Sequence, residues 1–89
     1  LGKHERALAD FDRAIALNPD DPDAYFHRGQ LFDRMGQPDR AIADLDRTIS
    51  LNPSYYQAYY SRSSVFRKTG QVERAERDLA IWKEHSTKR

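Results

Sequence analysis

Residues 1–19, LGKHERALADFDRAIALNP, return with the same pattern as residues 35–53, MGQPDRAIADLDRTISLNP. At this offset of 34 positions the two stretches share 11 identities in 19 positions. The register continues beyond them, because Tyr25 returns as Tyr59 at the same offset. A period of this length indicates a repeat protein, in which stacked copies of one supersecondary unit bury a continuous core.

Proline and glycine divide each repeat into two helices. Asp21 suits the N-cap of a helix and Pro22 its first turn. Gly36 can adopt the left-handed conformation that ends a helix, and Pro38 can open the next one. The Asn52-Pro53 break stops that second helix. The same signals along the chain predict about five helices, at 3–16, 22–35, 38–51, 55–69 and 72–85.

The apolar spacing explains why these helices must pair. In the first helix of the repeat, Tyr25, Gly29 and Phe32 recur at i, i+4 and i+7 and share one face. Ala41 and Leu45 form the matching stripe on the second helix. Gly29 is small at the place where a neighbouring helix has to approach closely. Helices this short are marginal alone in water, so their stability has to come from packing between helices and between hairpins.

The pattern resembles the tetratricopeptide repeat. The aromatic-x-x-Leu-Gly-x-x-aromatic signature of that family is matched by residues 25–32, YFHRGQLF, and residues 59–66, YYSRSSVF. Arg28 and Arg62 stand where the family usually has leucine. The family's later alanine, large apolar residue and proline are matched by Ala41, Leu45 and Pro53. The resemblance covers essentially the whole chain and implies an all-α, right-handed superhelical stack of antiparallel helix hairpins.

The register divides the chain into one incomplete and two complete repeats. Residues 1–19 match the second helix of a repeat, and residues 20–53 match a complete repeat. Residues 54–89 match another complete repeat with a terminal character, because Lys83 and His85 replace apolar residues of the earlier copy. We expect all three to form one folding unit and interpret the chain as the C-terminal piece of a longer array.

The composition argues against several classes of function. Fifteen Lys and Arg residues against fourteen Asp and Glu give a formal net charge of +1, so nothing favours a nucleic-acid partner. Cysteine is absent, which excludes a thiolate nucleophile and a cysteine-based metal site. No apolar run approaches the roughly 18 residues that span a bilayer, so we expect a soluble, cytoplasmic protein without a membrane partner.

No catalytic arrangement emerges from the sequence. There is no Gly-x-Ser-x-Gly motif, and His4, His27 and His85 lie in different repeats. Asp23 and His27 stand one helical turn apart, a spacing that can serve two metal ligands, but no third ligand is in view. We therefore expect no enzyme activity, no metal and no cofactor.

Arginine and aspartate recur at i, i+4 on successive second helices. Because such pairs are usually solvated, we expect them to form an exposed ladder that stabilises each helix by about 0.2–0.5 kcal/mol. The pairs are Arg6/Asp10, Arg40/Asp44 and Arg74/Asp78.

The family resemblance implies where a ligand would bind. In the tetratricopeptide architecture the first helix of each hairpin lines the concave surface, which is the usual peptide-binding face. We expect a protein or peptide partner in this groove, with Phe26 and Tyr60 as aromatic contacts. The candidate residues lie off the packing stripes of the two first helices. They are Phe26, His27, Gln30, Arg34, Gln57, Tyr60, Ser61, Ser64 and Lys68.

One subgroup of the family grips the C-terminal carboxylate tail of heat-shock chaperones with a clamp of lysine, asparagine and arginine. The corresponding places here hold Phe26, Gln30 and Ser61, or in the other register His27, Gln57 and Ser61. The clamp is absent in both registers. We therefore expect no binding of a chaperone tail in that manner.

Self-association is the alternative function. Leu8, Phe11 and Ile15 would normally be covered by the first helix of a hairpin, which residues 1–19 do not supply. An exposed apolar face favours association with another molecule. The alternative is therefore a homo-oligomer formed through the uncovered face of the first helix.

Overall fold

A computed structural model describes residues 2–86, and within this range the chain forms five α-helices and no strand. They are α1 (Lys3–Leu17), α2 (Pro22–Arg34), α3 (Pro38–Leu51), α4 (Tyr56–Lys68) and α5 (Val72–Ser86). Each bound lies within one residue of the helix expected from the sequence, so the all-α prediction is confirmed. Leu1 and residues 87–89, which the predicted repeats include, lie outside the described range.

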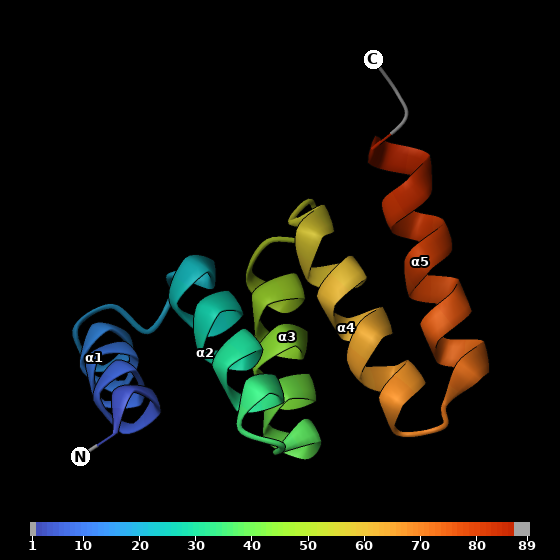
Figure 1. Ribbon diagram of the computed structural model, residues 1–89. Helices are drawn as coiled ribbons and strands as arrows, with labels where there is room; N and C mark the ends of the chain where they lie inside the picture. The colour runs from blue at the N-terminus through green and yellow to red at the C-terminus, as the bar shows by residue number, and fades with distance from the viewer. Residues whose placement is uncertain (1, 87–89) are drawn as a thin grey trace.

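The helices follow one another side by side along an elongated stack (Figure 1). Helix α2 packs most extensively against α3, and α4 against α5, so these pairs are the two hairpins. Helix α1 packs against α2, and α3 packs against α4 across the junction between the hairpins. None of the five helices is both long enough and apolar enough to cross a membrane.

The hairpin turns have the predicted chemistry. The side chain of Asp21 accepts a hydrogen bond of 3.0 Å from the backbone N–H two residues further on, which caps α2. Gly36 has a φ of 74°, and the N–H of Gln37 donates to the carbonyl oxygen of Phe32 at 2.9 Å. Gly70, with a φ of 81°, ends α4 in the same way. These left-handed glycines reverse the chain and so place the helices of each hairpin antiparallel.

The two helices of the first complete hairpin lie in close contact at Gly29. A Cβ atom added there would lie 3.2 Å from the carbonyl oxygen of Ala41 and 3.2 Å from Cγ of Leu45. Ala41 and Leu45 are fully buried. Ser63, buried on α4, occupies the equivalent place in the second hairpin. Small residues therefore let the two helices of each hairpin meet, as the spacing predicted.

A partly buried ion pair joins the two helices of each hairpin. Nε and Nη2 of Arg28 on α2 each donate a hydrogen bond of 2.8 Å to the carboxylate of Asp44 on α3. The remaining nitrogen, Nη1, donates to Asp12 on α1 at 3.0 Å. Arg28 thus connects three successive helices. Hydrogen bonding to Asp44 raises the pKa of Arg28 further above its already high value, so the guanidinium stays charged.

The second hairpin repeats the same arrangement. Arg62 on α4 donates two hydrogen bonds of 2.8 Å to Asp78 on α5 and one of 2.9 Å to Asp46 on α3. Arginine in place of the family's usual leucine therefore has a structural role in both copies. It bridges the helices of its own hairpin and reaches back to the preceding helix.

The expected exposed ladder of i, i+4 pairs is wrong for Asp44 and Asp78. Both aspartates are buried, and each is paired with the arginine of the facing helix. The guanidinium groups of Arg40 and Arg74 lie instead over phenylalanine rings, at 5.6 Å from the ring centroids. The physical reason is geometric, because the planar guanidinium of the facing helix matches both carboxylate oxygens at once.

We predict that Arg28→Leu, which restores the family's usual residue, lowers the free energy of unfolding by about 3 kcal/mol. Asp44, whose side chain is only 8% exposed, would be left buried without its cation. Urea denaturation followed by circular dichroism measures the change. Arg13→Leu, which alters an exposed arginine of α1, should shift stability by no more than about 0.5 kcal/mol.

The double variant Arg28→Leu/Asp44→Leu shows whether the stability lost in Arg28→Leu comes from the unpaired charge of Asp44 or from lost packing. Removing both charges should recover most of the stability lost in Arg28→Leu, since apolar residues can replace a buried ion pair at little cost. Equal stability of Arg28→Leu and the parent would show that the pair contributes nothing.

Candidate functional site

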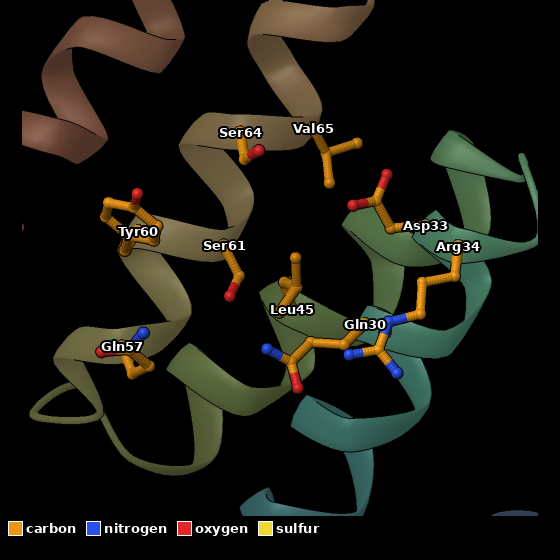
Figure 2. A pocket seen from close by; sticks show the side chains of 10 residues that line it. Gln30, Asp33, Arg34, Leu45, Gln57, Tyr60, Ser61, Ser64 and Val65 are labelled. Atoms are coloured by element: carbon orange, nitrogen blue, oxygen red, sulfur yellow. The ribbon is translucent and has the colours of Figure 1, made fainter.

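A hollow of about 220 Å³ opens between α2 and α4 (Figure 2). Buried residues form its floor, with Gly29 from α2, Leu45 from α3 and Val65 from α4. Polar and aromatic side chains form its walls. They are Gln30, Asp33 and Arg34 from α2, and Gln57, Tyr60, Ser61 and Ser64 from α4.

The hollow brings together six of the nine residues predicted from the sequence: Gln30, Arg34, Gln57, Tyr60, Ser61 and Ser64. Their contact with a peptide stays a prediction. Sequence reasoning missed Asp33, which lies one position before Arg34 and off the row of residues chosen by helical spacing. It also missed the floor, because the sequence pattern assigns Gly29 and Leu45 to helix packing and gives no signal for Val65.

Phe26 is not a surface residue, so its prediction as an exposed contact is wrong. It is only 6% exposed and belongs to the core cluster of buried residues. The ring of Tyr55, just before α4, lies over it with ring centroids 4.9 Å apart. The beginning of the next hairpin therefore covers Phe26. Tyr60, one repeat later, is 43% exposed and lies beside Trp82, with ring centroids 4.7 Å apart.

His27 and Lys68 lie outside the hollow. His27 is exposed and stacks on Phe11 of α1, with ring centroids 6.1 Å apart. Nζ of Lys68 contacts the carboxylate of Asp33 at 3.0 Å. Of the ten residues lining the hollow, the only cation is Arg34, which is exposed. Arg34 is therefore the positive group that a ligand would meet.

The two residues with metal-ligand spacing make other contacts. The carboxylate of Asp23 accepts a hydrogen bond of 2.7 Å from the hydroxyl of Tyr55, while His27 faces Phe11. Burial, together with the hydrogen bond to Asp23, raises the pKa of Tyr55 well above its usual value. Across residues 2–86, no three His, Asp or Glu side chains gather closely enough to hold a metal ion.

The residues expected to support self-association do not share one exposed face. Leu8 is half-buried and packs against the core, where it lies with Arg28 and Phe32 of α2. The expectation that Leu8 is uncovered is wrong, because α2 occupies that side of α1. Phe11 and Ile15 are also half-buried. Self-association itself stays a prediction.

Comparison with known proteins relates this chain to a repeat family. The family model of the tetratricopeptide repeat matches residues 2–59. No protein with curated annotation gives a match.

Several solved structures are similar. A crystal structure of MamA superposes with a TM-score of 0.88 at 33% identity, over 92% of this chain and 48% of that one, so the chain spans about half of MamA. The second repeat domain of Spaghetti (RPAP3), bound to the HSP90 peptide SRMEEVD, superposes with a TM-score of 0.86 at 25% identity. The match covers 91% of this chain and 75% of that one. The Yersinia enterocolitica type III secretion chaperone SycD, in complex with a peptide of the translocator YopD, superposes with a TM-score of 0.88 at 23% identity. The match covers 93% of this chain and 63% of that one. This last likeness concerns the fold alone.

We predict different costs for truncating the two aromatic residues that share a repeat position. Phe26→Ala should lower the free energy of unfolding by about 3–5 kcal/mol, because it leaves a cavity in the core. Tyr60→Ala should cost only about 1 kcal/mol, mainly the contact with Trp82. Urea denaturation of both variants decides the point, and a larger loss for Tyr60→Ala would contradict the assignment of Phe26 to the core.

Proposed function

The chain belongs to the tetratricopeptide repeat family, and we propose that it is a protein-interaction module that holds a peptide segment of another protein in the hollow between α2 and α4. The family is generally a non-catalytic interaction fold. The observation that carries the proposal is the form of the hollow, with an apolar floor and polar walls on two successive first helices. Ligand sites commonly combine these two properties.

The walls offer the groups that an extended peptide requires. The amides of Gln30 and Gln57 can donate and accept hydrogen bonds, and the hydroxyls of Ser61 and Ser64 can do both as well. An extended peptide exposes backbone N–H and carbonyl groups that pair with such side chains. Tyr60 presents part of its ring for an apolar side chain of the ligand.

The charges of the hollow further limit which charged side chains a bound peptide can carry. Arg34 can pair with one carboxylate, while Asp33 contributes a negative charge beside it. Lys68 offsets that charge from outside the hollow. The site therefore suits a peptide with one acidic group near Arg34 and otherwise neutral polar and apolar residues. A strongly acidic segment would find too few cations.

We predict that the HSP90 peptide SRMEEVD, which the second repeat domain of Spaghetti binds, does not bind this chain. Its three acidic side chains and terminal carboxylate would meet Arg34 and Asp33 rather than a cluster of cations. Fluorescence polarisation with labelled peptide measures binding, and the Spaghetti domain is the positive control. A dissociation constant in the micromolar range would show that the chain binds chaperone tails without the usual clamp.

We predict that a groove variant loses peptide binding. A ligand is first selected from displayed random peptides, and its Kd is measured by fluorescence polarisation. Arg34→Ala/Tyr60→Ala should raise the Kd at least about tenfold, since it removes the cation and the exposed aromatic residue of the hollow.

The matched control is Arg13→Ala/Val72→Ala, which removes an exposed arginine and a 47% exposed apolar residue away from the hollow. Its Kd should equal that of the parent, and circular dichroism should show all three proteins equally helical. A selected peptide that binds both double variants with the parent's affinity would place the interaction outside the hollow.

A further inference from the structure

Two further hollows recur with the repeat, one between α1 and α3 and the other between α3 and α5. We name them the α1/α3 hollow and the α3/α5 hollow. Their volumes are about 370 Å³ and about 530 Å³. Every residue that lines the α1/α3 hollow has its counterpart, 34 positions later, in the lining of the α3/α5 hollow. The two hollows are therefore successive copies of one feature of the repeat.

The two copies differ in charge at one of these shared positions. The α1/α3 hollow has Ala43 there, and its two arginines face two aspartates. The α3/α5 hollow has Arg77 at this position, so three arginines face two aspartates. One of the three, Arg62, already pairs with both aspartates, Asp46 and Asp78. The α3/α5 hollow therefore has one positive charge more than its own carboxylates neutralise.

The other two arginines of the α3/α5 hollow are accessible. Arg74 and Arg77 are exposed on α5, and no carboxylate within residues 2–86 forms an ion pair with either. Arg74 donates a hydrogen bond of 3.1 Å to the side-chain oxygen of Gln71, and its guanidinium lies 5.6 Å from the ring centroid of Phe66. The guanidinium of Arg77 makes neither kind of contact with the described part of the chain. Arg77 is therefore the cation available to an incoming carboxylate.

Neighbouring hairpins do not close these hollows. The α1/α3 hollow stays open although α4 and α5 follow it in the stack. The α3/α5 hollow stays open although α1 and α2 precede it. Accessibility on this part of the surface is therefore a property of the repeat itself.

Apolar side chains lie beside the surplus charge. Ile42 of α3 and Ile81 of α5 are half-buried and line the same hollow. Ile81 follows Arg77 by one helical turn, which is about 6 Å along the axis of α5. A helix lying along α5 has the same rise per residue, so an acidic and an apolar residue one turn apart on it would reach both side chains.

We propose that the α3/α5 hollow is a second docking surface, distinct from the hollow between α2 and α4, with which it shares no lining residue. Its occupant is an amphipathic helix of a partner protein that carries a carboxylate one turn away from a large apolar side chain. The carboxylate pairs with Arg77, and the apolar side chain packs between Ile42 and Ile81. A peptide as short as SRMEEVD forms no stable helix alone, so it is not such an occupant. The proposal does not depend on peptide binding between α2 and α4.

The probe is a displayed library of helical peptides of about 20 residues, a length that supports a helix in water. Every member carries one glutamate and one leucine a turn apart, and its other surface positions are randomised without acidic residues. The tightest peptide selected on the parent chain is labelled, and its Kd is measured by fluorescence polarisation. Replacing its glutamate by glutamine should raise the Kd at least about tenfold. Arg77→Ala in the chain, which introduces the residue type of the α1/α3 hollow, should raise the Kd by a similar factor.

Two controls separate this surface from others. Arg67→Ala removes an exposed cation of α4 that lies outside the α3/α5 hollow, and it should leave the Kd unchanged. Arg34→Ala/Tyr60→Ala alters only the hollow between α2 and α4 and should also leave the Kd unchanged.

Several results would overturn the proposal. They are failure to select any peptide, insensitivity of the selected peptide to Arg77→Ala or to loss of its glutamate, and an equal loss of affinity in Arg67→Ala, which would indicate general attraction between opposite charges. Loss of binding in Arg34→Ala/Tyr60→Ala would place the peptide between α2 and α4 instead. Dimerisation of the chain alone that Arg77→Ala abolishes would also overturn it, because the occupant would then be a second copy.

Discussion

The two-pronged pairing of Arg28 with Asp44 is the constraint on which the first complete hairpin depends. It fixes the relative positions of α2 and α3 at the level where the two helices are in close contact at Gly29. A buried carboxylate needs a compensating charge, so only one register of the two helices satisfies both packing and electrostatics. The same pairing in the second hairpin makes the two units nearly equivalent, and the hollow between α2 and α4 results from placing them side by side.

Features that depend on residues close together in the chain, or on the size of a single residue, could be predicted from the sequence. The caps at Asp21 and Gly36 and the close approach at Gly29 follow from local residue chemistry, and the structure contains all three. The helix bounds also follow, because proline and glycine mark them. These features require no knowledge of what lies beyond the hairpin.

Features that depend on the next hairpin could not be predicted in the same way. Phe26 and Tyr60 occupy the same repeat position, yet Tyr55 covers Phe26 and leaves it in the core, whereas Tyr60 remains exposed. The partner of Asp44 could not be predicted either, although it lies in the same hairpin, because Asp44 has one arginine a turn away along its own helix and another on the facing helix. Spacing along the chain cannot decide between them. The choice depends on which guanidinium presents its planar edge to the carboxylate.

The third nitrogen of Arg28 has a consequence for how the stack loses its structure. It joins α1 through Asp12, whose side chain is 55% exposed, whereas the side chain of Asp44 is only 8% exposed. The outward contact is therefore screened more strongly by water and salt than the inward contact. In repeat proteins each unit contacts only its neighbours and is stabilised only by them. Added salt is thus expected to loosen the junction between α1 and α2 before it loosens the pairing of α2 with α3, so that amide protection against hydrogen exchange falls first in α1.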